Sequence, residues 1–113
     1  MTALITRDEL REAIAAGTVT VVDALPESYY AQVHLPGAVN LVEDDVESRA
    51  ADQLPDRDAP IVTYCSNPAC GNSQAVATRL ERLGYRNVRK YREGVQDWVA
   101  AGLPTESGLP VAS

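Results

Sequence analysis

Short apolar runs alternate with longer amphipathic segments along the whole chain. Residues 19–22, 61–64 and 88–91 are rich in β-branched or aromatic side chains, which is typical of strands. Two shorter apolar runs, residues 4–5 and 38–41, predict two further strands. The run at 61–64 is the clearest of the five, and it leads directly into Cys65.

The segments between these runs have the spacing and the end signals of helices. Thr6 and Glu9 match a capping box, and Gly17 is a suitable C-terminal stop for the helix between them. Pro26 fits the first turn of a short helix that continues through Gln32. Further helices are predicted from residue 43 onwards, from Ser73 to Gly84, and over residues 95–101.

Strands that alternate with helices at this spacing predict an α/β fold with a parallel sheet. We find no internal repeat and no second domain, so residues 1–113 are predicted to form one domain. Residues 103–113 are predicted to be an irregular surface tail, because this segment is rich in Gly and Pro. In parallel sheets the ligand crevice lies beyond the carboxyl ends of the strands, where Cys65 is placed.

Composition excludes several classes of function. The 113 residues include 10 basic and 16 acidic side chains, and a net charge of −6 argues against a nucleic-acid partner. No apolar run approaches the roughly 20 residues that span a bilayer, and the N-terminus lacks the pattern of a signal peptide. We therefore expect a cytoplasmic protein without a membrane partner.

The charge is unevenly distributed along the chain. Residues 1–65 hold 4 basic and 12 acidic side chains, whereas the remainder holds 6 basic and 4 acidic ones. The overall acidity therefore hides a basic second half. These basic groups could assist an anionic donor or an acidic protein partner at long range, or they could simply be solvated.

Potential metal ligands are scarce. Two Cys and one His make a poor zinc site, because structural zinc takes four such ligands at paired spacing. Glu43, Asp44, Asp45 and Glu47 form an acidic cluster, which the dipole at a helix N-terminus would stabilise. A carboxylate metal site is the alternative interpretation of this cluster, but we predict no metal.

The segment after Cys65 has the pattern of a strand, a loop and a helix. If the loop curls around Cys65, its amides point at the sulfur and the pKa of the thiol falls below about 8.5. A thiolate held in this way is a nucleophile, although a Cys that ends a buried strand can also be a small core residue. The candidate substrate-binding residues are Ser66, Asn67, Pro68, Ala69, Cys70, Gly71, Asn72 and Ser73.

Four segments, in order, resemble the signatures of rhodanese-like domains. Residues 21–41 place an aspartate at a strand end and continue to H-L-P-G-A, and I-V-T-Y-C resembles the strand that carries the family's catalytic cysteine. Residues 83–88 and the segment E-G-V-Q-D-W resemble those that close the domain. This resemblance covers nearly the whole chain. It implies a single rhodanese-like domain with a five-stranded parallel sheet and helices on both faces.

The resemblance also implies sulfur transfer through a persulfide on Cys65. Sulfane sulfur would pass from a small-molecule donor such as thiosulfate to a thiol or another thiophilic acceptor, including a protein acceptor. No metal or organic cofactor would be needed. Asp23 would support the site by hydrogen bonding. His34 would tie a loop to nearby backbone, and its alternative role is that of a base for Cys65.

The active loop departs from the family's usual pattern. Seven residues separate Cys65 from Ser73 where five are usual, and no charged side chain lies between Cys65 and Arg79. Further departures are Leu25, Val33 and the pair Glu93–Gly94, which stand where the family often has Arg, Gly and Gly-Gly. These departures weaken the expectation of selectivity for an anionic donor.

The longer loop also contains a second cysteine. Cys70 could resolve a Cys65 persulfide or sulfenic acid as a disulfide, relay sulfur, or only fill space. The alternative function is therefore a binding or redox-sensing module without turnover that uses the Cys65–Cys70 pair. Phosphatase activity, which occurs on a similar fold, is disfavoured because Gly71 occupies the position of the required Arg.

Overall fold

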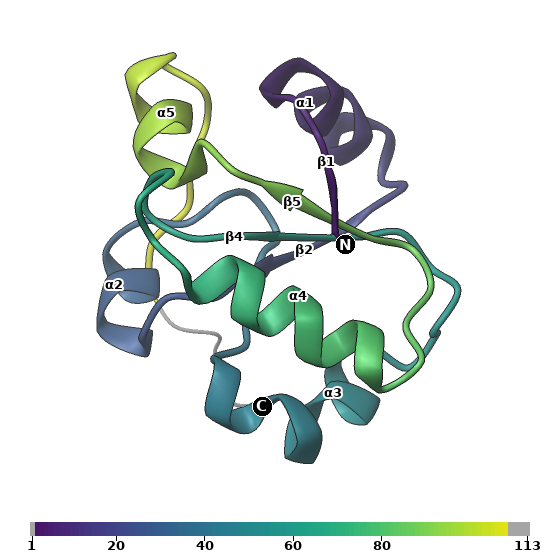
Figure 1. Ribbon diagram of the computed structural model, residues 1–113. Helices are drawn as coiled ribbons and strands as arrows, with labels where there is room; N and C mark the ends of the chain where they lie inside the picture. Colours follow the sequence, from purple (N-terminus) through teal and green to yellow (C-terminus); the bar gives the residue numbers. More distant parts are fainter. Residues whose placement is uncertain (1, 109–113) are drawn as a thin grey trace.

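The five short apolar runs form one parallel sheet, as predicted. The computed structural model describes residues 2–108. Its strands are β1 (Ala3–Leu4), β2 (Thr20–Asp23), β3 (Val39–Asn40), β4 (Ile61–Tyr64) and β5 (Val88–Tyr91). They lie in the order β1-β5-β4-β2-β3, with β4 in the centre (Figure 1). All four residues of β4 are buried, as is typical of the central strand of a parallel sheet.

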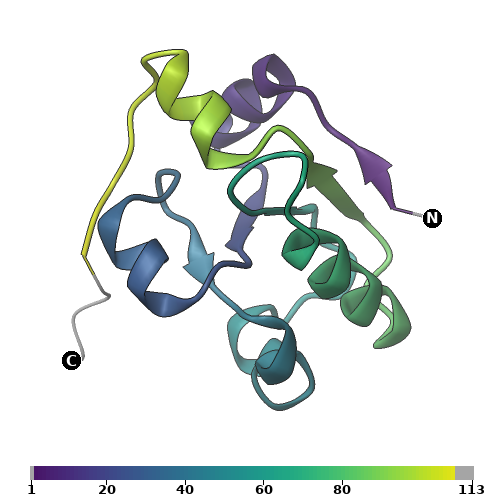
Figure 2. The same cartoon turned by 60° about the vertical axis from the view of Figure 1, so that its left-hand side comes forward.

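Helices cover both faces of the sheet, and each face has its own core (Figures 1 and 2). On one face, Val62 and Tyr64 of β4 pack in one cluster with residues of α1 (Arg7–Ala16), α2 (Glu27–Gln32) and α5 (Gly94–Ala100). On the other face, Ile61 packs with residues of α3 (Val46–Gln53) and α4 (Asn72–Arg82). Adjacent residues of β4 therefore face opposite cores, as the pleat of a strand requires.

The helix-end signals are confirmed at α1 and differ at α2 and α4. Thr6 and Glu9 form the reciprocal capping box, and Gly17 takes the left-handed conformation. Pro26 lies just before α2, as its N-cap, and not within the first turn. The helix predicted from Ser73 to Gly84 spans Asn72–Arg82, and Gly71 is its N-cap. Ser73 is instead buried inside the first turn.

The predicted irregular tail makes specific contacts in its described part, residues 103–108. The Trp98 indole nitrogen donates to the Pro104 carbonyl over 2.7 Å. Glu106 pairs with His34 in an antiparallel bridge, through two backbone hydrogen bonds of 2.8 Å. The Gly108 amide donates to the Ala31 carbonyl over 2.7 Å. This segment therefore fastens α5 to α2 and the turn after it. Residues 109–113 lie outside the described part.

The helices within residues 2–108 are all too short or too polar to cross a membrane.

Candidate functional site

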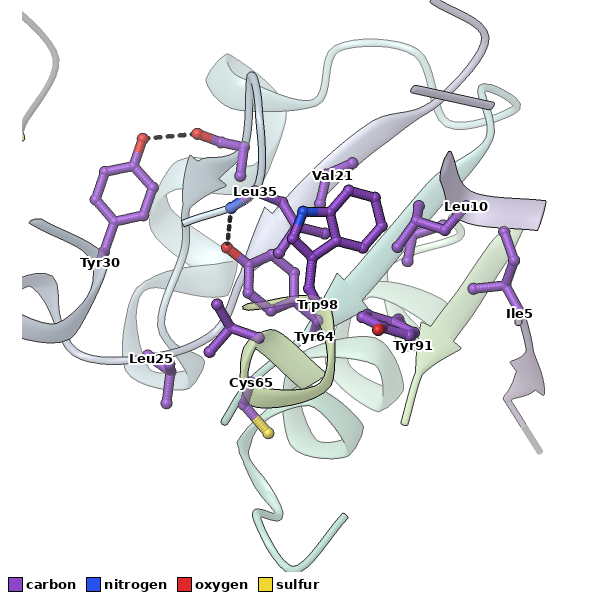
Figure 3. Packing of buried hydrophobic residues seen from close by; sticks show 13 residues of the cluster. Ile5, Leu10, Val21, Leu25, Tyr30, Leu35, Tyr64, Cys65, Tyr91 and Trp98 are labelled. Atoms are coloured by element: carbon purple, nitrogen blue, oxygen red, sulfur yellow. Dashed lines mark hydrogen bonds between the residues drawn. The ribbon is translucent and has the colours of Figure 1, made fainter. Parts of the chain in front are cut away.

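Cys65 lies directly beyond the carboxyl end of the central strand β4. Its side chain is buried at the end of the core cluster that also contains Tyr64, Tyr91 and Trp98 (Figure 3). Neighbouring β2 ends at Asp23, which pairs in register with Tyr64. The sheet thus brings the predicted nucleophile and the predicted supporting aspartate to the same edge.

A close approach by α5 fixes the start of the loop. The Val95 amide donates to the Cys65 carbonyl over 2.8 Å, and the Gln96 amide donates to the Ser66 carbonyl over 3.0 Å. Gly94 makes this approach possible, because a Cβ atom there would lie 2.6 Å from the carbonyl oxygens of Cys65 and Ser66. Gly94 also has a φ of +77°, which L side chains rarely adopt. The first helical amides of α5 therefore hold the backbone on which the thiol is mounted.

The thiol of Cys65 faces two acceptors. Its Sγ lies 3.4 Å from the Cys70 carbonyl oxygen and 3.4 Å from the hydroxyl oxygen of Ser73. Burial raises the pKa of the Cys65 thiol, and its hydrogen bond with Cys70 raises the pKa further. The Ser73 hydroxyl and amide oppose this rise. The prediction that an amide cradle lowers this pKa is therefore wrong, because burial and a partner that accepts the proton outweigh the amides.

Cys70 is the more acidic thiol of the pair. Burial opposes its ionisation, but the hydrogen bond from the Cys65 thiol and the amides of Asn72 and Ser66 lower the pKa of Cys70. Part of the predicted amide cradle therefore serves Cys70. Both cysteines are free thiols in this structure.

Two asparagines, Asn67 and Asn72, form the hydrogen bonds that hold the rest of the loop. The Asn67 carboxamide oxygen accepts from the Ala69 amide over 2.9 Å, and the Asn67 carbonyl accepts from the Cys70 amide over 3.0 Å. The Asn72 carboxamide donates to the Ala24 carbonyl over 3.4 Å, beyond the end of β2. Four of the predicted binding residues are exposed: Pro68, Ala69, Gly71 and Asn72. Ser66, Asn67 and Cys70 are half-buried, and Ser73 is buried.

Asp23 is the centre of a buried hydrogen-bond network. Its carboxylate accepts from the Tyr64 hydroxyl over 2.7 Å and from the Leu25 amide over 2.8 Å. The Tyr64 hydroxyl in turn accepts from the Leu35 amide over 3.0 Å (Figure 3). Burial raises the pKa of Asp23, and the two donors oppose this rise. Sequence reasoning missed Tyr64, although a tyrosine in a buried strand needs a partner for its hydroxyl.

The His34 side chain contacts Tyr30 and Glu106, and not Cys65. The imidazole stacks on the Tyr30 ring, with centroids 3.8 Å apart, and its Nδ1 lies 2.7 Å from the Tyr30 carbonyl oxygen. Its Nε2 lies 3.8 Å from a carboxylate oxygen of Glu106. Within residues 2–108, neither ring nitrogen forms a hydrogen bond with Cys65.

The acidic cluster lies next to the loop. Glu43 and Glu47 both contact the Arg79 guanidinium at 3.3 Å, and residues 2–108 contain no group of three or more side chains placed to hold a metal ion. Glu43 and Asp44 also border a shallow pocket beside Asn72. The remaining lining residues of this pocket are Ala24, Pro26 and Val42. Carboxylates therefore stand at one side of the candidate site.

Several known proteins are similar to this chain in sequence and in fold. A family model described as a rhodanese-like domain matches residues 6–101. The "HTH-type transcriptional regulator Rv0324" of Mycobacterium tuberculosis is 39% identical over 95% of this chain and 46% of its own length. The chain thus spans about half of that curated relative.

Solved structures give the same match. The thiosulfate sulfurtransferase of Pseudomonas aeruginosa superposes with a TM-score of 0.84 at 30% identity, over 95% of this chain and 20% of that one. The BH2092 protein of Bacillus halodurans superposes with a TM-score of 0.85 over 94% of this chain and 77% of that one. At 23% identity, this second structure supports the fold alone.

Replacement of Asp23 tests the buried network. Asp23→Ala leaves the Tyr64 hydroxyl and the Leu25 amide without their acceptor, so we expect the free energy of unfolding to fall by about 2–4 kcal/mol. Urea denaturation measures this loss. Asp58→Ala is the control, because Asp58 is exposed and its contact with Arg86 is 3.7 Å long. A loss for Asp23→Ala no larger than that for Asp58→Ala would contradict the account.

Replacement of Gly94 tests the close approach of α5. Gly94→Ala places a Cβ atom against the Cys65 and Ser66 backbone, in addition to the strain of a positive φ. Gly102→Ala is a matched control, since Gly102 has a φ of +72° and no atom within 4 Å of an added Cβ. We expect Gly94→Ala to lower the free energy of unfolding by about 2 kcal/mol more than Gly102→Ala does. Equal losses in urea denaturation would show that only the backbone angle matters.

Proposed function

The chain belongs to the rhodanese-like domain family, and we propose that it is a sulfurtransferase that carries sulfane sulfur as a persulfide on Cys65. The observation that supports this proposal most strongly is the placement of Cys65. It is the only cysteine at the carboxyl end of a sheet strand within residues 2–108, and α5 anchors its backbone. A reactive side chain at this edge of a parallel sheet lies where such folds bind their ligands.

The proposed reaction has two steps. Cys65 loses its proton to solvent, and the thiolate attacks the outer sulfur of a donor such as thiosulfate. The S–S bond of the donor breaks and sulfite leaves with the electron pair, which forms the Cys65 persulfide. A thiolate acceptor, on a small molecule or a protein, then attacks the outer sulfur and regenerates the Cys65 thiolate. The Ser73 amide and hydroxyl support the negative charge on sulfur during both steps.

The charges around the loop bear on the choice of donor. Glu43 and Asp44 border the pocket beside Asn72, and the loop itself contributes no charged side chain. Glu43 is paired with the Arg79 guanidinium, but the charge of Asp44 repels a dianion, so we propose that thiosulfate is a slower donor than a persulfide of lower negative charge. We also propose that an acceptor thiol of low negative charge reacts faster than a strongly anionic one.

A second candidate function is a redox-sensing module that uses Cys65 and Cys70. Two observations favour it. The two cysteines lie close enough for each to shift the pKa of the other, and a relative of 39% identity is named as a transcriptional regulator. In this function, peroxide oxidises the two thiols to a disulfide and is itself reduced to two molecules of water. The pair would then report an oxidant without turning over a sulfur donor.

Loss of the Cys65 thiol tests the first candidate. We expect the wild-type protein to form thiocyanate from thiosulfate and cyanide, and Cys65→Ser to fall to the uncatalysed rate, because a serine hydroxyl cannot carry the persulfide. Thiocyanate is measured as its coloured iron complex. Cys70→Ala serves as the control and keeps the activity. Full activity in Cys65→Ser would exclude Cys65 as the sulfur carrier.

Intact mass after peroxide treatment tests the second candidate. A disulfide between Cys65 and Cys70 removes two hydrogen atoms, so the redox-sensing function predicts this loss in the wild type and its absence in Cys70→Ala. The loss must also be reversed by a dithiol reductant. A wild-type protein that gains oxygen atoms without losing hydrogen would rule out the resolving role of Cys70.

A further inference from the structure

The Cys70–Gly71 peptide presents its oxygen, not its N–H group, to the candidate nucleophile. The Cys70 carbonyl oxygen lies 3.4 Å from the Cys65 Sγ, where it accepts the thiol proton. This contact suits a protonated sulfur. Once the proton has left, a carbonyl oxygen and a thiolate would face each other as two partial or full negative charges.

Gly71 has the backbone angles of the third residue of a type I turn. Its φ is −90° and its ψ is −4°. A type II turn differs by rotation of the peptide before this residue, which brings φ to about +80° and leaves ψ near 0°. Only glycine, and to a lesser extent asparagine, adopts that positive φ readily. Glycine is therefore not required by the observed backbone angles at residue 71, but it is required by the angles after rotation.

Little else in the loop opposes such a rotation. Within residues 2–108, the Cys70 carbonyl accepts no backbone hydrogen bond and the Gly71 amide donates none. The next carbonyl, that of Gly71, accepts from the Ala75 amide over 3.1 Å, and it belongs to the following peptide. The first helical hydrogen bond of α4 would therefore survive the rotation. Gly71 is also exposed, with open space around its Cα.

We propose that the Cys70–Gly71 peptide rotates when Cys65 ionises or carries a persulfide, so that the Gly71 N–H replaces the Cys70 carbonyl beside the sulfur. Gly71 is then a positioning residue, since it acts on the sulfur by allowing the peptide to turn. The longer loop of this chain thus has a protonated resting form and a form that supports a charged sulfur. The inference rests on the proposed function only in taking Cys65 as the nucleophile.

Titration of Cys65 in variants of residue 71 tests this inference. Cys70 faces Cys65 directly, and the Asp23 carboxylate acts on Cys70, so all variants are made in a Cys70→Ala background with Asp23 kept. The rate of alkylation by iodoacetamide is measured against pH, and its midpoint gives the pKa of Cys65. Thermal unfolding is measured in parallel. Gly71→Ala should leave it unchanged, because the observed φ suits alanine and an added Cβ meets no atom within 4 Å.

The two informative variants are Gly71→Ala and Gly71→Asn. We expect Gly71→Ala to raise the alkylation midpoint by about one pH unit, a roughly tenfold loss of thiolate, because alanine resists the positive φ. Gly71→Asn should raise it less, since asparagine tolerates that φ although its side chain is larger. Unspecific damage to the loop predicts the reverse order.

The outcomes separate this inference from the proposed function. The alkylation midpoint needs no sulfur donor, so it can depend on residue 71 even in a protein that transfers no sulfur. An unchanged midpoint in Gly71→Ala would overturn the peptide rotation and leave the sulfurtransferase proposal standing. An alkylation midpoint in Gly71→Asn equal to or above that in Gly71→Ala would also overturn the peptide rotation.

Discussion

The contact between Gly94 and the backbone of Cys65 and Ser66 determines the geometry of the candidate site. Because glycine brings no side chain there, α5 comes close enough for its first amides to bind the two carbonyls that follow β4. Both carbonyl oxygens are thereby occupied by amides of α5. The groups left to contact the Cys65 Sγ come from the far end of the loop, namely the Cys70 carbonyl and Ser73.

A second constraint acts from the opposite side of β4. The Asp23 carboxylate accepts a hydrogen bond from the hydroxyl of Tyr64, the residue before Cys65. The same hydroxyl accepts from the Leu35 amide. Between these two anchors the nucleophile has a fixed position, whereas the Cys70 carbonyl and the Gly71 amide form no backbone hydrogen bond within residues 2–108. The site therefore combines a fixed sulfur with an adjustable peptide. This division explains how one loop can hold both a buried thiol and a charged sulfur.

Sequence reasoning succeeded where the signal is local. The strands 61–64 and 88–91 and the capping box at Thr6 follow from adjacent residues, and the structure confirms them. It failed where distant contacts decide. The rise in the pKa of Cys65 depends on burial in the folded core and on its hydrogen bond with Cys70, five residues away. The ordered segment at residues 103–108 depends on partners in and beyond α2, which no local pattern indicates.

The proposed sulfurtransferase function requires that Cys65 receives sulfur as a persulfide. Its most direct test is the intact mass of the protein after incubation with a sulfane sulfur donor and removal of the excess, followed by peptide mapping. We expect a gain of one sulfur atom, located on Cys65 and released by a thiol acceptor. A protein that gains no sulfur from any donor, or that carries it on Cys70 in the Cys65→Ser variant, would contradict the proposed function.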